Sequence, residues 1–162
     1  MVSIRISIAI AACVTLAGST AELRAQSAPD NAQQTVEQAL RAASVQLRAA
    51  AEKLDANALY AYVLDTATPP IIEAGRVAPT RAAALAGTVA GFQGLTSISY
   101  HYTREHVTVL SPTAALWVGE GTATALLRDG REIEAPFAET LVWVMRDGQW
   151  KILHAHRSVP QR

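Results

Sequence analysis

Two histidines stand one residue apart near the end of the chain, at His154 and His156. Side chains of a regular strand alternate between its two faces, so both rings are expected on the face that also carries Trp150 and Ile152. Neutral imidazoles can bind a metal, transfer protons or hydrogen-bond to a carboxylate. The pair therefore predicts either the polar end of a pocket wall or rings that hydrogen-bond to neighbouring strands and water.

A metal site would need at least one further ligand at a suitable angle. The side chains that could supply it are His101, Glu120 and Glu139, which lie on other segments. Nothing in their spacing brings them to the two histidines. We therefore predict no metal and no cofactor.

Tyrosines form the second group of side chains that could take part in chemistry or in ligand binding. In a regular strand Tyr100 and Tyr102 face one way and His101 the other. A phenol gives a pocket an apolar wall with a hydroxyl at its tip, although paired tyrosines on a sheet also serve packing alone. Tyr60 and Tyr62 cannot share a helix face at a spacing of two, so at most one of them points at a cavity.

Carboxylates on apolar strand faces are the third group. Glu120 and Glu139 lie within predicted strands, where an unpaired charge is unfavourable. Each could act as a general base near a histidine, or form an ion pair with Arg104, Arg157 or another arginine. Asp65 could also be a base, but its surroundings fit an ordinary helix end. The candidate catalytic residues are thus His154, His156, Glu139 and Asp65.

Four strands are predicted to carry most of these side chains. Asp-Gly pairs at 129–130 and 147–148 are strong hairpin signals, and Ser-Pro-Thr at 111–113 marks a third turn. The strands between them span residues 96–110, 114–127, 132–145 and 150–157. They predict a meander, which is a mainly antiparallel sheet.

The first half of the chain reads as helical. Apolar residues recur at three- and four-residue steps over residues 34–54, a short second helix follows, and a third spans about 79–92. A brief strand is possible at 71–74. We predict an α+β fold of one domain over residues 34–158, with a flexible leader at 26–33 and a tail at 159–162.

The start of the chain has the layout of a secretory signal peptide. Met1–Arg5 carry positive charge, an apolar run follows, and small-residue cleavage options end at Ala21 and Ala25. We predict that residues 1–25 are removed on export to the periplasm or the outside of the cell. The alternative is a lipoprotein anchored through Cys13, the only cysteine.

The charge composition limits the classes of partner that the chain is predicted to bind. Lys and Arg number 14, as do Asp and Glu, so the formal net charge is zero. Nucleic acids and anionic membranes favour a clustered positive surface, which this sequence does not have. We predict neither partner for the mature chain.

The element order and the tail resemble the nuclear transport factor 2-like (NTF2-like) superfamily. The residues that carry the resemblance run from Val142 through the Asp147-Gly148 turn and Trp150 to the His-Ala-His-Arg-Ser end at Ser158. It is closest to the SnoaL-like and DUF4440-type branches and to the association domain of calmodulin-dependent kinase II. The resemblance implies a cone-shaped fold with helices closing a curved sheet over a cavity, and often a homodimer formed through the sheet.

Three functions are compatible with these observations, because fold alone does not choose among them. The first is an exported small-molecule-binding domain without catalysis. The second is an isomerase or dehydratase of the SnoaL or ketosteroid isomerase kind that uses histidine, tyrosine and a carboxylate. The third is a homo-oligomeric assembly module. The predicted ligand-binding residues are Tyr60, Tyr100, Tyr102, Glu139, His154 and His156.

Overall fold

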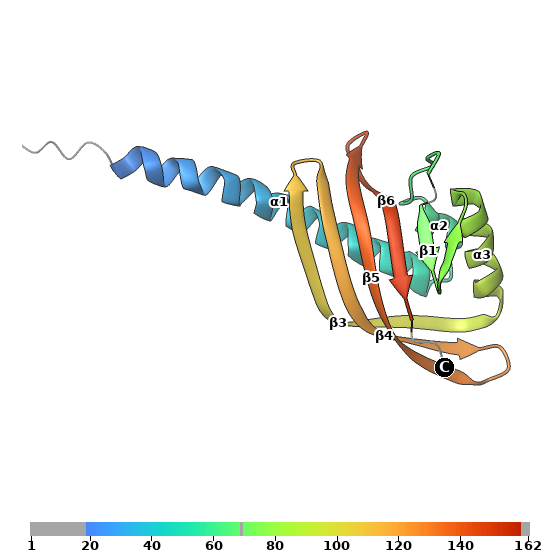
Figure 1. Ribbon diagram of the computed structural model, residues 1–162. Helices are drawn as coiled ribbons and strands as arrows, with labels where there is room; N and C mark the ends of the chain where they lie inside the picture. The colour runs from blue at the N-terminus through green and yellow to red at the C-terminus, as the bar shows by residue number, and fades with distance from the viewer. Residues whose placement is uncertain (1–18, 69, 160–162) are drawn as a thin grey trace, which may run out of the picture.

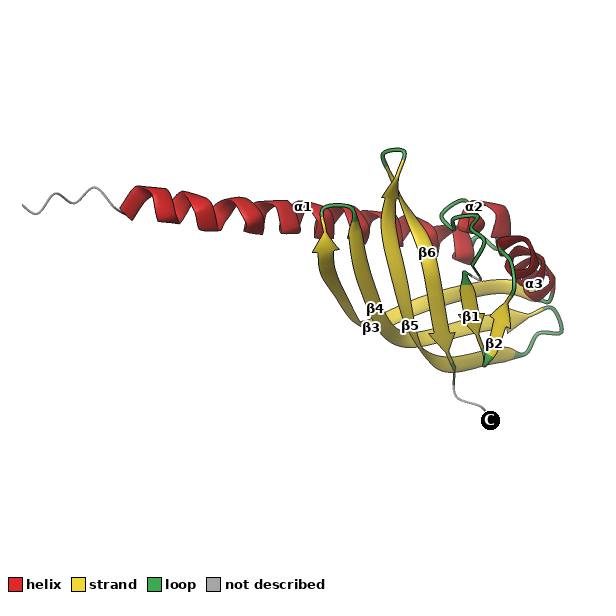
Figure 2. Cartoon of the chain, turned by 45° about the horizontal axis from the view of Figure 1, so that its top comes forward, coloured by secondary structure: helices red, strands yellow, loops and turns green. Residues whose placement is uncertain are grey.

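The chain forms a curved six-stranded sheet with helices on its concave side (Figures 1 and 2). This computed structural model describes residues 19–68 and 70–159. The α+β prediction is confirmed. Cys13, most of the predicted signal peptide and the last three residues lie outside the described part.

Helix α1, Ser19–Glu52, crosses the concave side of the sheet, and its first half extends beyond the sheet edge (Figure 2). Its buried face contributes Leu40, Ala50 and Ala51 to the core. The helix includes residues 26–33, which the sequence predicted as a flexible leader. The helix continues through this stretch although it contains Pro29, which lacks a backbone N–H and usually kinks or ends a helix.

The end of α1 is a tight corner. The Leu54 N–H donates to the Ala51 carbonyl, and the Asp55 N–H donates to the Ala50 carbonyl. With Leu54 at a φ of 57°, this is a Schellman ending. Asp55 then caps α2, Ala56–Tyr60, by accepting from the Ala58 N–H at 2.9 Å.

A hairpin of two short strands follows, β1 (Ile71–Glu73) and β2 (Arg76–Ala78). The sequence predicted β1 but not β2, since three residues are too few for a periodic signal. Strand β1 pairs in parallel with the last strand of the chain, opposite residues 155–157. This pairing brings Glu73 beside Arg157.

Helix α3, Arg81–Gln93, begins where the sequence predicted. Thr80 caps it by accepting a hydrogen bond from the Ala83 N–H at 3.1 Å. The helix lies beside α2 and the β1–β2 hairpin (Figure 1). It forms the wall of the fold that faces the inner side of the sheet.

The four long strands also follow the prediction. They are β3 (Leu95–Ser111), β4 (Ala114–Leu127), β5 (Glu132–Arg146) and β6 (Gln149–Ser158). The sheet order is β2-β1-β6-β5-β4-β3, and all neighbours except β1 and β6 are antiparallel. Asp147 and Gly148 both have positive φ, at 50° and 73°, as the predicted hairpin turn requires.

The sheet bends sharply midway along β3 and β4 (Figure 1). A register shift between Tyr102 and Arg104 leaves Thr103 as an extra residue in β3. Opposite it, a Cβ on Gly121 would lie 2.1 Å from the His101 carbonyl oxygen. Only glycine permits this backbone approach, so the bend that creates a concave face depends on that position.

Strand β6 has an irregularity that overturns one prediction. Trp143 pairs with Ile152, but the preceding Val142 pairs with His154, so Leu153 is an extra residue. Trp150 and Ile152 face inward, whereas His154 and His156 face outward with their partners Val142 and Thr140. The expectation that all four residues share a face is wrong, because one inserted residue reverses the alternation.

The core lies between α1 and the inner face of the sheet. Trp117 and Trp143 are almost completely buried there, at 1% and 0% exposure, and Trp150 is 9% exposed. Glu120, on the other face of β4, is exposed and pairs with Arg104 at 3.4 Å. The tryptophans are therefore core residues. Glu120 forms an ion pair, as one of the two sequence interpretations predicted.

Candidate functional site

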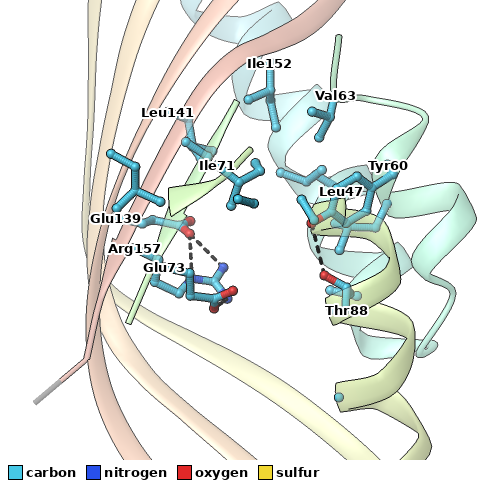
Figure 3. Close-up of a pocket in the computed structure, with 18 of the residues that line it drawn as sticks. Leu47, Tyr60, Val63, Ile71, Glu73, Thr88, Glu139, Leu141, Ile152 and Arg157 are labelled. Atoms are coloured by element: carbon cyan, nitrogen blue, oxygen red, sulfur yellow. Dashed lines mark hydrogen bonds and ion pairs between the residues drawn. The ribbon is translucent and has the colours of Figure 1, made fainter. Parts of the chain in front are cut away.

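A cavity of about 740 Å³ lies between the helices and the inner face of the sheet. Small-molecule sites have volumes of roughly 300–1,000 Å³ and largely apolar walls. Figure 3 shows aliphatic side chains from both layers facing this space. They include Leu47, Leu59, Val63, Ile71, Ile98, Leu141 and Ile152.

A buried ion pair stands at the sheet side of the cavity (Figure 3). Glu139 on β5 lies opposite Arg157 on β6 and is only 6% exposed. Arg157 donates from Nε and Nη2 to Oε2 of Glu139, at 3.0 and 2.7 Å. Burial by itself disfavours the charged guanidinium, but Glu139, Tyr100 and Glu73 together outweigh it and raise the pKa of Arg157.

Tyr102 hydrogen-bonds to the other oxygen of this carboxylate. Its hydroxyl donates to Oε1 of Glu139, and the Arg48 guanidinium lies over its ring at 4.2 Å. Burial, together with the Glu139 charge, raises the pKa of Tyr102, so the phenol stays neutral. A Cβ on Gly119 would meet the Tyr102 ring at 2.8 Å, so glycine at this position makes room for the ring.

Tyr100 lies next to the same guanidinium. Nη1 of Arg157 donates to the Tyr100 hydroxyl at 3.4 Å and approaches Oε1 of Glu73 at 3.9 Å. Both contacts are longer than those to Glu139. Glu73 comes from β1, so the parallel pairing of β1 with β6 supplies the third charge of this group.

A second polar position lies across the cavity, on α2 and α3 (Figure 3). The Tyr60 hydroxyl and Oγ1 of Thr88 are 3.1 Å apart. Burial raises the pKa of Tyr60, so this phenol is neutral as well. Arg81 fixes the backbone behind it by donating to the carbonyls of Tyr60 and Val63, at 2.5 and 2.9 Å.

Comparison with known protein families shows which family the chain belongs to. The profile of the SnoaL-like domain matches residues 40–162, which is most of the chain. The chain belongs to the SnoaL-like domain family. No curated protein matches it in sequence.

Solved structures show that this SnoaL-like domain has the NTF2-like fold, as the tail motif suggested. A proposed dehydratase of the NTF2-like family from Streptomyces avermitilis has a TM-score of 0.69 and 17% identity, covering 80% of this chain and 99% of the other. A proposed scytalone dehydratase from Novosphingobium aromaticivorans has a TM-score of 0.70 and 14% identity, with coverages of 82% and 89%.

A proposed calcium/calmodulin-dependent kinase II association domain from Xanthomonas campestris has a TM-score of 0.64 and 18% identity, with coverages of 75% and 85%. At such low identities, these likenesses establish the fold of the SnoaL-like domain and leave its function open.

The cavity of the SnoaL-like domain brings together four of the six predicted ligand-binding residues: Tyr60, Tyr100, Tyr102 and Glu139. Tyr62 follows the end of α2, is not among the lining residues and contacts Trp143 edge-on, with 6.4 Å between ring centroids, so only one of the two tyrosines reaches the cavity, as expected.

His154, His156 and Asp65 are not among the lining residues, and the sheet register also places His101 on the outer face. Of the four candidate catalytic residues, only Glu139 lies at the cavity. Among the described residues, no three histidine, cysteine or acidic side chains are grouped as a metal would require.

Several residues of the site were missed by sequence reasoning. Arg157 was considered only as an ion-pair partner, and Arg48, Glu73 and Thr88 were not singled out. Arg48 lies on the helix stripe beside Leu47, and its charge at the edge of an apolar stripe was the available signal. Glu73 and Thr88 carry no signal of this kind, because their positions depend on the packing of β1 and α3 against the sheet.

Within residues 19–68 and 70–159, no helix combines the length and apolarity needed to cross a membrane.

Proposed function

We propose that this SnoaL-like domain binds a small, largely apolar organic molecule in the cavity beneath its helices. The observation that carries the proposal is the cavity itself, about 740 Å³ in volume, with aliphatic walls and hydroxyl and guanidinium groups at two positions. Such concave sites with a few convergent polar groups are the usual form of small-molecule sites.

Binding is better supported than an isomerase or dehydratase reaction. The predicted mechanism needs a carboxylate and a histidine that reach one point. Glu139 is at the cavity, but each of its oxygens already accepts a hydrogen bond, Oε2 from Arg157 and Oε1 from Tyr102. No histidine is among the lining residues. Structural neighbours that are proposed dehydratases make catalysis a second candidate on fold grounds alone.

The test is a substitution on β3 that places a larger side chain in the cavity. Ile98 lines the cavity, and the adjacent Ser99 is exposed on the other face of β3. The fluorescence of anthracene and 2-acetylanthracene, titrated with purified protein, would measure binding. We expect Ile98→Phe to weaken binding and Ser99→Phe to leave it unchanged. Absence of saturable binding of either compound to the wild-type chain would refute the proposal.

We further propose that the domain forms a homodimer through the outer face of its sheet. In the described part of the chain, the helices lie on the concave side, so they do not cover this face (Figures 1 and 2). Val118 is 41% exposed there and lies between His106 and Thr140 in a row across the strands. Light scattering of the wild-type chain and of Val118→Asp would test this, and a monomeric wild-type protein would exclude it.

Export is the third proposal, and it rests on the charged start and the apolar run of the sequence. Cell fractionation and mass spectrometry of the mature N-terminus would test it. An N-terminus directly after Ala21 or Ala25 supports a cleaved signal peptide, a diacylglyceryl group on Cys13 supports the lipoprotein alternative, and retention of Met1 contradicts both.

A further inference from the structure

The polar groups at the sheet side of the cavity differ in what they can still bind. Each oxygen of Glu139 already has a donor, because Oε1 accepts from Tyr102 and Oε2 accepts twice from Arg157. The single hydroxyl proton of Tyr102 is used in the same contact. Neither side chain therefore offers a ligand a free hydrogen-bond donor on this side; Oε1 of Glu139, with one donor, can still accept a second hydrogen bond.

Two donors next to this set remain available. Nη1 of Arg157 makes only the long contacts to the Tyr100 hydroxyl, at 3.4 Å, and to Glu73, at 3.9 Å. The Tyr100 hydroxyl accepts in the first of these, so its own proton remains to be donated. Both side chains line the cavity. A ligand oxygen placed beside them would receive hydrogen bonds from a phenol and a guanidinium.

The charge around these donors is already compensated. The positive charge of Arg157 faces the carboxylates of Glu139 at 2.7 Å and Glu73 at 3.9 Å. Arg48, the other partly buried cation of the lining, pairs with Glu105 at 2.7 Å. Arg76 is exposed, where water screens its charge. A ligand carboxylate would therefore add a third negative charge around one guanidinium.

At the opposite end of the cavity the lining groups are uncharged; the Arg81 guanidinium lies behind Tyr60, 6.0 Å from its ring centroid, and is not a lining residue. Tyr60 and Thr88 hydrogen-bond to each other through neutral hydroxyls, and aliphatic side chains fill the walls between the two ends. A charged ligand group placed there would lose its hydration without gaining a counter-charge. Neither end of the site thus compensates a ligand charge.

From this geometry we infer the class of ligand: a neutral, mostly apolar molecule whose carbonyl or ether-type oxygen accepts hydrogen bonds from the Tyr100 hydroxyl and Nη1 of Arg157. This inference rests on the proposed binding function and adds to it the polar group that is recognised. It also gives Tyr100 a defined role as a donor that determines specificity.

The experiment compares four probes that share one ring system: anthracene, 2-acetylanthracene, anthracene-2-carboxylate and 2-anthrylmethylammonium. Fluorescence titration at pH 7 gives each dissociation constant. We expect 2-acetylanthracene to bind roughly 3- to 10-fold more tightly than anthracene, the gain of one or two net hydrogen bonds, and both ions to bind more weakly than the ketone. Equal binding of ketone and hydrocarbon, or tightest binding of either ion, overturns the inference.

Two variants make the outcome specific. Tyr100→Phe keeps the ring and removes the hydroxyl, and should reduce the preference for ketone over hydrocarbon about 3-fold or more while leaving anthracene binding unchanged. Tyr62→Phe, a tyrosine directed away from the cavity, should change neither. An unchanged preference in Tyr100→Phe contradicts the inference while the binding function stands. Failure of all four probes to bind the wild-type chain contradicts the proposed function itself.

Discussion

Arg157 and Glu139 lie directly opposite each other on β6 and β5, and two nitrogens of the guanidinium donate to a single carboxylate oxygen. The second oxygen accepts from Tyr102 on β3. Because Glu139 is 6% exposed, these three donors replace the water that a free carboxylate would bind. Together with Tyr102, the pair thus connects three strands of the sheet at the wall of the cavity.

The first prediction follows from this burial. Arg157→Met leaves Glu139 inside the protein without a counter-charge, and such changes cost about 3–5 kcal/mol. We expect the free energy of unfolding, measured by urea denaturation at pH 7, to fall by about this amount. The double variant Arg157→Met/Glu139→Leu should recover much of the loss, because it removes the unpaired charge as well.

Arg104→Met is the matched control for this prediction. It breaks the Arg104–Glu120 pair, whose side chains are 67% and 48% exposed. Exposed pairs contribute about 0–1 kcal/mol. Equal losses in the two single variants would mean that burial of Glu139 has no energetic consequence.

The second prediction concerns the bend of the sheet. Gly121→Ala would place a Cβ 2.1 Å from the His101 carbonyl oxygen, which is backbone and cannot rotate away. We expect a loss of at least about 2 kcal/mol in the free energy of unfolding, the range of overpacked interiors. Gly91→Ala, on α3 with no atom within 4 Å of the added Cβ, should instead raise stability by up to about 1 kcal/mol. Thermal unfolding of both variants measures the contrast, and similar melting temperatures would contradict it.

Features that depend on local chemistry could be predicted from the sequence. The Asp147-Gly148 turn was readable because both residues must adopt positive φ, which this dipeptide tolerates. The start of α3 near residue 79 could also be predicted, and in the structure the Thr80 hydroxyl accepts a hydrogen bond from the Ala83 N–H there. The ion-pair interpretation of Glu139 followed from the energy of burying a charge.

The side chains of β6 could not be placed in this way. A bulge is decided by how β6 matches β5, and Leu153 carries no signal that it is the extra residue. One unpaired residue removed His154 and His156 from the cavity and put Arg157 into it. Of the partners of Arg157, Glu139 was among those expected from the sequence, whereas Glu73 could not be predicted, since it reaches Arg157 only through the parallel pairing of β1.

The third prediction uses the raised pKa of Tyr102. Above pH 10, near the ordinary tyrosine pKa, the unfolded chain releases this phenol proton while the folded chain keeps it. The folded state then binds more protons, so stability falls as the pH rises from about 10 toward the folded pKa. Urea denaturation between about pH 9 and 11.5 should show a shallower decline in Tyr102→Phe than in the wild type. Parallel declines would contradict the shift.

The fourth prediction tests which face of β6 binds the ligand. Because Leu153 is inserted into the strand, His154→Ala and His156→Ala remove rings from the outer face, and neither should change the affinity for 2-acetylanthracene. Tyr60→Phe, at the far end of the cavity, removes a hydroxyl from the lining and should weaken any probe long enough to reach Thr88. A loss of about tenfold or more in either histidine variant, with an unchanged oligomeric state by light scattering, would mean that β6 is regular and that the histidines line the cavity. An unchanged affinity of both histidine variants would mean that the ligand is bound on the face of β6 that carries Arg157.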